Sequence, residues 1–358
     1  MQTPFAKKGG GSIAALLLLA FVPFYLGETS YTLDIVVRIL LFVGLCSAWN
    51  IVGGMAGQLA FAHSLFIAAG AYSVALFARE QWSPWLALIL GAGISVVMGG
   101  FIAWLAARFQ MKHLSFALIT LAFSELGLLA VMSSDSLGGP AGLSMPYGGQ
   151  GNVWMYEFTS NVGHYWVAAG LAVFSTGTGW LLWRSRLGYQ FRCIRDNEMA
   201  ATALGISPLR VKVVSMCISA ALTGILGGAY ANYLAYVDPH FFAAPTLIIQ
   251  IILFTAVGGM GTVWGPALGA VIFVPISDIL RTEFGGSLPP GAHVVFYGIF
   301  VIVVILFARG GLISVLENLA RAVRKHSQRD EGRDPDFPVG RDPNRSAFLT
   351  NTSKGNGR

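Results

Sequence analysis

The chain carries a polar segment between two long apolar runs. The runs are residues 164–183, HYWVAAGLAVFSTGTGWLLW, and residues 213–235, VVSMCISAALTGILGGAYANYLA. The polar segment between them, residues 188–212, reads GYQFRCIRDNEMAATALGISPLRVK. Apolar runs of about 18 or more residues are typical of helices that cross a lipid bilayer. The three stretches therefore predict two spanning helices joined by a charged loop.

The composition of the whole chain favours a membrane protein. Of its 358 residues, 55% are hydrophobic and only 11% are charged, whereas soluble domains carry roughly 25% charged residues. Because the first and eighth of the predicted spans are short, the number of true spans stays open between eight and ten. We predict an all-α, polytopic fold with spans at residues 12–27, 32–52, 59–78, 84–106, 114–132, 164–183, 213–235, 244–257, 263–280 and 291–308.

The placement of Lys and Arg predicts the orientation of these spans. Cytoplasmic loops of membrane proteins are enriched in positive residues. With ten spans, 20 of the 23 Lys and Arg residues fall on one side of the membrane. We therefore expect both termini in the cytoplasm. The net charge of +6 is interpreted as a topology signal and not as a nucleic-acid-binding surface.

These predictions divide the chain into three parts: a cytoplasmic N-terminus (1–11), a transmembrane domain (12–308) with its loop at 184–212, and a basic tail (309–358). The tail is rich in Gly, Pro and mixed charge, which is typical of disorder. The first apolar run follows two lysines, as in a signal peptide. No clear small-residue cleavage site follows it, so we interpret it as a span.

The loop at 184–212 contains the pattern of a short helix. Asp196 or Asn197 can cap its start, and Glu198 lies in the first turn, where the helix dipole favours an anion. Alanines and a leucine continue the helix, Gly205 ends it, and Pro208 allows a second short helix to begin. An ordinary positive loop would need only the basic residues. We therefore predict a docking helix with a small-residue face for another protein, flanked by arginines such as Arg195.

The segment RDNEMAATALGIS resembles the loop with which permeases of bacterial ATP-binding-cassette (ABC) importers dock their ATPase subunits. Glu198, Ala200, Ala201 and Gly205 match the Glu-Ala-Ala pattern and its downstream glycine, with Met199 inserted after the glutamate. Within this resemblance, Arg195 and Asp196 complete the predicted ATPase-coupling set.

Three further stretches resemble the branched-chain amino acid permeases of this class. They read WNIVGGMAGQLAFAHSLFIAAGAY at 49–72, TLAFSELGLL at 120–129 and GGMGTVWGPALGA at 258–270. The resemblance covers roughly residues 31–310, and the chain is more similar to the longer of the two permease types in such transporters. It implies a multi-pass protein of the bacterial inner membrane. The implied partners are two ATPase subunits, a second related permease and an extracytoplasmic substrate-binding protein.

Two glycine-rich segments in the chain repeat a pattern. GGMAGQ at 53–58 and GGMGTVWG at 258–265 each lie between apolar runs. Glycines there can break a helix so that the backbone lines a transport route. Equally, small residues can simply allow close helix contact. The candidate residues for a route or a helix break are Gly53, Gly54, Gly57, Gln58, His63, Gly258, Gly259 and Gly261.

Two charges, Arg38 and Glu125, fall inside predicted spans. Each costs roughly 2.5–3.5 kcal/mol at mid-helix unless it is paired or hydrated. Both lie about 10 Å below the predicted outer surface, given the helical rise per residue. The leading hypothesis is an ion pair between them. The alternative is that Glu125 lines the solute path and meets the amino group of a zwitterion. Asp278 and Arg281 are interpreted as solvated groups near the outer interface.

The chain lacks a phosphate-binding loop of the form GxxxxGK[ST]. We therefore expect no cofactor on this chain, with ATP and Mg²⁺ bound by the partner ATPases. Catalysis is not expected, because His63 and Ser64 are adjacent and point about 100° apart on a helix. The three cysteines show no spacing of a metal site or disulfide framework. The alternatives are a urea or short-amide ABC permease, and an ion-coupled transporter that acts alone.

Overall fold

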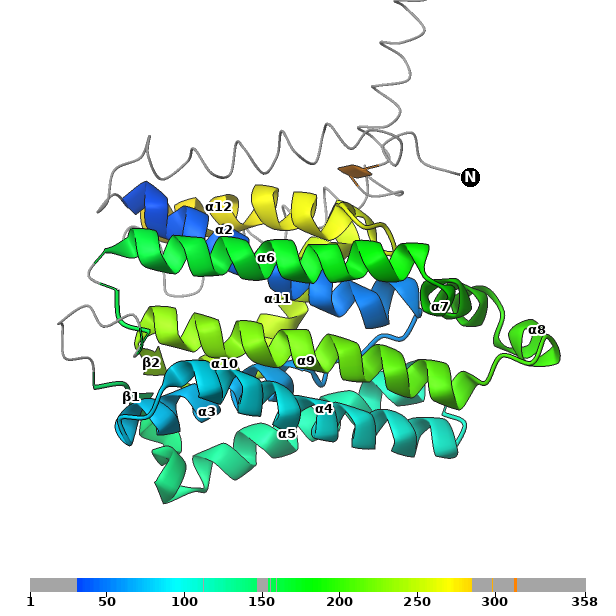
Figure 1. The fold of residues 1–358 in the computed structure, drawn as a ribbon, viewed down its shortest axis with the longest axis horizontal. Coiled ribbons are helices and arrows are strands. Elements are labelled where there is room, and N and C mark those ends of the chain that lie inside the picture. Colours follow the sequence, from blue (N-terminus) through cyan, green and yellow to red (C-terminus); the bar gives the residue numbers. More distant parts are fainter. Residues whose placement is uncertain are drawn as a thin grey trace, which may run out of the picture. The chain divides into compact units, whose positions relative to one another are not determined.

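The computed structural model describes residues 31–111, 113–146, 154, 156–158, 160–284, 298, 312 and 313. The compact unit that contains them ends at Val315. Its long helices are α2 (Tyr31–Asn50), α3 (His63–Arg79), α4 (Pro84–Arg108), α5 (His113–Met132), α6 (Asn161–Arg184), α9 (Pro208–Leu234), α11 (Pro245–Gly259) and α12 (Gly265–Phe284). These helices form one bundle, in which most of them run roughly along a common direction and α11 crosses it (Figure 1).

Shorter elements connect the long helices. They are the π-helical turn η2 (Ile51–Met55), the 3-10 turns η3 (Asp135–Leu137) and η4 (Gly139–Ala141), the strands β1 (Leu143–Ser144) and β2 (Tyr236–Val237), and the helices α7 (Arg186–Asp196), α8 (Glu198–Ala203) and α10 (Pro239–Phe242). The two strands pair antiparallel, with Leu143 opposite Val237. Because α7 and α8 lie at the opposite end of the bundle from β1 and β2 (Figure 1), we call these ends the loop end and the hairpin end.

The all-α, polytopic fold is confirmed. Among the described residues, six helical segments are long and apolar enough to cross a membrane. The span predicted at 59–78 is shorter than expected, because α3 begins only at His63 and has 17 residues. The predicted spans 12–27 and 291–308 lie outside the described residues, apart from residue 298, as does the predicted tail apart from residues 312 and 313.

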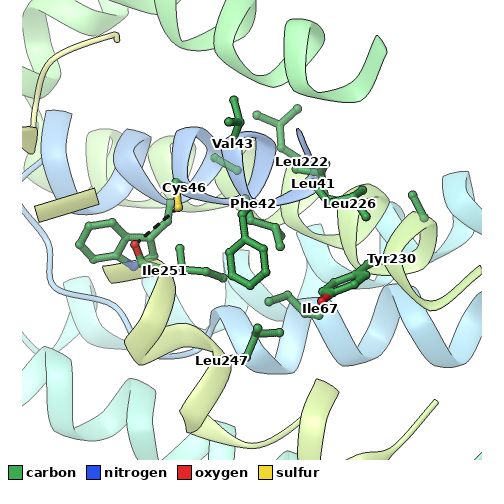
Figure 2. Packing of buried hydrophobic residues seen from close by; sticks show 14 of the residues in the cluster. Leu41, Phe42, Val43, Cys46, Ile67, Leu222, Leu226, Tyr230, Leu247 and Ile251 are labelled. Carbon is green, nitrogen blue, oxygen red and sulfur yellow. Dashed lines mark hydrogen bonds between the residues drawn. The ribbon is translucent and has the colours of Figure 1, made fainter. Parts of the chain in front are cut away.

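The centre of the bundle is an apolar core. Helix α9 packs along α3 and α4, and α2 packs along α6 and α12. Phe42 of α2 points into a cluster formed with Ile67 of α3, Leu226 of α9 and Ile251 of α11 (Figure 2). All four side chains are at least nine-tenths buried. Because lipid tails are as apolar as these side chains, such packing stabilises a membrane-spanning bundle mainly through van der Waals contacts.

Side-chain hydrogen bonds tie four helices together near the hairpin end. Asp34 Oδ1 of α2 accepts from Asn161 Nδ2 of α6 at 2.7 Å and from the hydroxyl of Tyr233 of α9 at 3.1 Å. One turn further along α2, Arg38 Nη1 donates to Asp278 Oδ1 of α12 at 3.1 Å. We call this group of five residues the hairpin-end network.

The predicted ion pair between Arg38 and Glu125 is wrong. Arg38 pairs with Asp278, which was interpreted as merely solvated. Glu125 lies on α5 with its side chain exposed. The error came from matching depth along the membrane normal, because equal depth does not bring two helices into contact. The side chain of Arg281 lies outside the described part of the chain.

Candidate functional site

The loop between α6 and α9 folds into two consecutive helices. The hydroxyl of Ser185 accepts from the backbone N–H of Gly188 at 3.1 Å and caps α7. The side-chain oxygen of Asn197 accepts from the backbone N–H of Ala200 at 3.0 Å and caps α8. Of the two predicted caps, Asn197 is therefore the cap, and Asp196 is the last residue of α7. The predicted short helix within the loop exists and starts at Glu198, as expected.

The end of α8 follows the prediction, but the next helix does not. Gly205 has a φ of +84°, a left-handed conformation that glycine adopts without a steric cost. Pro208 begins α9, which continues for 27 residues. The predicted second short helix is thus the first turns of a long span. Proline at the first helical position loses nothing, because its missing N–H would have no helical partner.

Helix α7 was missed by the sequence analysis. It buries Phe191 and Ile194, which are spaced three residues apart and so share one helical face. Arg192 lies over the ring of Trp183 at 4.1 Å and donates to the carbonyl oxygen of Trp183 at 3.0 Å. The amphipathic spacing in FRCIR was the signal that could have found this helix.

Arg195, at the end of α7, reaches the first glycine-rich segment. Its Nη1 donates to the carbonyl oxygen of Gly54 in η2 at 3.0 Å. Gly57 has a φ of +70°, and a Cβ there would overlap the Arg195 side chain. Glycine at this position therefore allows the backbone to follow a left-handed turn directly against Arg195.

The second glycine-rich segment meets the first at the same point. Asn50 donates from Nδ2 to the carbonyl oxygen of Thr262 at 2.8 Å, and its Oδ1 accepts from the backbone N–H of Gly261 at 2.9 Å. A Cβ on Gly261 would lie 2.6 Å from Arg195 Nη1. We call this meeting of η2, the α11–α12 connection and Arg195 the break junction. The two segments that share a sequence pattern are in contact, and Arg195 of the loop at 184–212 contacts both.

The remaining glycines of the pattern are packed closely. Gly258, at the end of α11, is buried, and a Cβ there would overlap the carbonyl group of Gly265 in α12. Gly259 follows with a φ of +130°, and Gly53 lies in η2 over the ring of Trp49. At Gly258 small residues allow close helix contact, as the second interpretation proposed. Their role in a solute route stays a prediction.

Helix α8 is held at its start and exposed along its outer side. Both carboxylate oxygens of Glu198 accept from Lys212 Nζ of α9, at 2.8 and 3.0 Å. Ala201 is buried, whereas Ala200 is exposed. The exposed face also carries Met199, which is 84% exposed. Only part of the predicted small-residue face is therefore free for a partner, and a large apolar side chain lies beside it.

His63 and its neighbour Ser64 take separate partners. His63 Nε2 lies 2.7 Å from Ser219 Oγ, and this hydroxyl donates to the carbonyl oxygen of Ala48 at 2.7 Å. The hydroxyl of Ser64 hydrogen-bonds with that of Ser124 on α5. Both side chains are fully buried. The two residues thus join α3 to different helices and do not form a nucleophile–base pair.

The described basic residues divide between the two ends of the bundle. The hairpin end carries Arg79 at the C-terminus of α3 and Arg38 of the hairpin-end network, and Arg281 lies in the last turn of α12. The loop end carries seven, namely Arg108, Arg184, Arg186, Arg192, Arg195, Arg210 and Lys212. The loop end is the end that the topology prediction places in the cytoplasm, and this orientation stays a prediction.

Comparison with known proteins gives the chain a family. A family described as "Branched-chain amino acid transport system / permease component" matches residues 31–305. The chain is 28% identical to the high-affinity branched-chain amino acid transport system permease protein LivM of Salmonella typhimurium, over 75% of this chain and 68% of that protein. LivM of Escherichia coli shows the same identity and coverage.

A more distant relative comes from an archaeon. The probable branched-chain amino acid transport permease protein LivM of Methanocaldococcus jannaschii is 23% identical over 64% of this chain and 67% of its own length. No solved structure matches the chain. The family match, which covers residues 31–305, shows that the chain belongs to the branched-chain amino acid transport system permease family.

Proposed function

We propose that the chain is a membrane-spanning permease subunit of an ATP-driven importer for branched-chain amino acids. The observation that carries this proposal is the contact of Arg195 with the break junction. A loop that only set topology would need positive charge, but it would not need a side chain inserted between two interrupted helices. The names of the LivM relatives support the substrate class.

The geometry supports a path by which movement of a partner ATPase could reach the spanning helices. A partner ATPase that docks on α8 would move α7 as well, because Asn197 directly follows α7 and is also the cap of α8. Arg195 would carry this movement to Gly54 and to the turn at Gly261. A hydrogen bond from a charged donor contributes about 1.5–3 kcal/mol. One such bond is strong enough to bias a helix break between two positions.

The proposal assigns the nucleotide to other subunits. With no phosphate-binding loop in the sequence, two ATPase subunits would hold ATP and Mg²⁺ on the cytoplasmic side. A second, related permease would complete the path, and an extracytoplasmic binding protein would deliver the amino acid. ATP binding can shift the permease only through a different affinity for its inward and outward states.

Reconstitution tests the proposal directly. Proteoliposomes would contain either this chain alone or the chain with both ATPases and the second permease, with the binding protein outside. We expect uptake of labelled leucine only in the complete assembly and only with ATP inside. Uptake by the chain alone, driven by an ion gradient, would contradict the proposal. Uptake of urea but not of leucine by the complete assembly would contradict the substrate class.

A further inference from the structure

A pocket opens at the loop end of the bundle, beside the break junction. It lies between the end of α4, the start of α5, helix α8 and the first turn of α9. Its volume is about 890 Å³, within the range of roughly 300–1,000 Å³ that is usual for small-molecule sites. Residues of the loop at 184–212 and of the spanning helices thus line the same cavity.

Gln58 lines this pocket and is 3% exposed. Neither the nitrogen nor the oxygen of its side-chain amide has a hydrogen-bond partner among the described residues. A buried polar group without a partner is destabilising, because it has lost its hydrogen bonds to water. Because Gln58 follows directly after the left-handed Gly57, its place is set by the break junction. The pocket therefore holds a fixed amide that needs both an acceptor and a donor.

The rest of the lining has two characters. Glu198 and Lys212 present opposite charges at one side, and Arg108 of α4 adds a second positive charge. Met111 and Phe116 present apolar surface from the α4–α5 connection and from α5. A ligand that matches this lining carries a carboxylate, an ammonium group and an apolar side chain.

We propose that this pocket binds the transported amino acid as a zwitterion and is its final binding site before release. This inference rests on the proposed function and names a site for its substrate. The carboxylate would accept from Lys212 and from the Gln58 nitrogen, while the ammonium would donate to Glu198 and to the Gln58 oxygen. The apolar side chain would pack against Met111 and Phe116.

Binding in this pocket would make the importer sensitive to its own product. The ligand would compete with the Glu198–Lys212 bridge, which holds α8 against α9. Amino acid that accumulates on the loop-end side would refill the pocket and slow the next cycle. Glu198 and Lys212 both line the pocket and hold α8 against α9. Ligand binding in the pocket is therefore linked to the position of α8.

The test uses the complete transporter in proteoliposomes with ATP and increasing unlabelled leucine inside. Initial uptake of labelled leucine is expressed relative to each variant's own rate without internal leucine. Gln58→Leu keeps the size of the side chain but removes its amide, and Met111→Trp fills the cavity from a half-buried position. We expect both to raise the internal leucine concentration that halves uptake by at least about tenfold, Gln58→Leu because the ligand loses polar partners and Met111→Trp because its side chain occupies the pocket.

The matched control is Gln81→Leu, the same change at an exposed residue of the hairpin end. It should keep the wild-type inhibition curve. Wild-type inhibition curves in both pocket variants would overturn the inference while leaving the proposed function intact, because ATP-driven uptake would persist. Loss of ATPase subunits from both variants in a pull-down would also overturn it, since the pocket would then seat a partner protein. Absence of leucine uptake in the wild-type assembly would instead reject the proposed function.

Discussion

At the hairpin end, the polar side chains of the network join helices to one another, whereas at the loop end Arg195 is directed to a backbone turn and the Gln58 amide has no partner among the described residues. Asp34 alone accepts from two other helices, and Arg38 pairs with a third. At the loop end, Arg195 reaches backbone groups of a broken helix, and Gln58 lines a pocket. Under the proposed function, the hairpin end is fixed by its own contacts and the loop end responds to partner subunits.

The loop end also exposes apolar surface. Met199, within α8, and Leu204, directly after it, are 84% and 77% exposed. Exposed apolar residues rimmed by charge are typical of protein interfaces. The hairpin end instead closes the long α5–α6 connection by pairing β1 with β2. Substitutions at the loop end should therefore affect the coupling of ATP hydrolysis to transport, and substitutions at the hairpin end should affect stability.

The largest effect is expected from Gly57→Val at the break junction. A β-branched residue at a φ of +70° is strained by about 1–3 kcal/mol, and its side chain would overlap Arg195. We expect ATP-driven uptake to fall by at least about tenfold, in line with that strain. Uptake of labelled leucine by the complete transporter measures this.

The control for this prediction is Gly170→Val in α6, where an added Cβ meets open space. It should retain uptake, because it adds only the small helix cost of a β-branched residue. Equal losses in the two glycine variants, at equal membrane insertion, would show that the break junction has no special role.

An intermediate effect is expected at the bridge between Glu198 and Lys212. Glu198→Lys would place two ammonium groups together and move α8 away from α9, so a pull-down should recover little ATPase. Because the Glu198 side chain is 41% exposed, the bridge itself contributes roughly 1 kcal/mol or less to stability. The inserted amount of the variant should therefore stay normal.

The exchanged pair Glu198→Lys with Lys212→Glu separates two explanations of that loss. If the bridge acts by positioning α8, the exchanged pair restores ATPase recovery. Continued loss would mean that Glu198 contacts the ATPase itself, and the positioning role would be wrong.

The smallest effect on transport is expected at the hairpin-end network. Asp278→Asn removes the charge that pairs with Arg38, whose side chain is 26% exposed. Loss of about 1 kcal/mol lowers the unfolding temperature by roughly 2–4 °C in a chain of this order of size. Thermal unfolding of the purified chain should show this decrease, while relative uptake stays close to wild type.

Glu125→Gln is the matched control, because Glu125 is exposed and forms no ion pair among the described residues. Its unfolding temperature should not change. A fall in uptake with unchanged stability would instead support the solute-path role considered for Glu125. Unchanged stability in Asp278→Asn would refute the structural role of its pair.

Much of the fold could be predicted, because spanning helices follow from apolar run length alone. Helix α8, its N-terminal cap and its terminating glycine also followed from local rules, since caps and glycine stops act within a few residues. Helix α7 was missed because its apolar face consists of only Phe191 and Ile194, and basic residues stand beside them in the sequence. The bound of α3 was misjudged because residues 59–62 are apolar but not helical.

The contacts between distant segments could not be predicted in the same way. The partner of Arg38 depends on which helix packs beside α2, and the sequence constrains only the depth of each charge. The break junction was half predicted: the repeated glycine pattern pointed to two corresponding breaks, but not to their contact through Asn50. The insertion of Arg195 between them depends on α7, which had not been anticipated.

The number of ATP molecules hydrolysed for each amino acid taken up is the measurement that tests the coupling claim most directly. It should be determined for Arg195→Ala and, as a control, for the exposed Arg186→Ala. We predict that Arg195→Ala still binds and hydrolyses ATP but needs at least about ten times more ATP per solute, because a charged hydrogen bond of about 1.5–3 kcal/mol is lost. An unchanged ratio in Arg195→Ala would contradict the account.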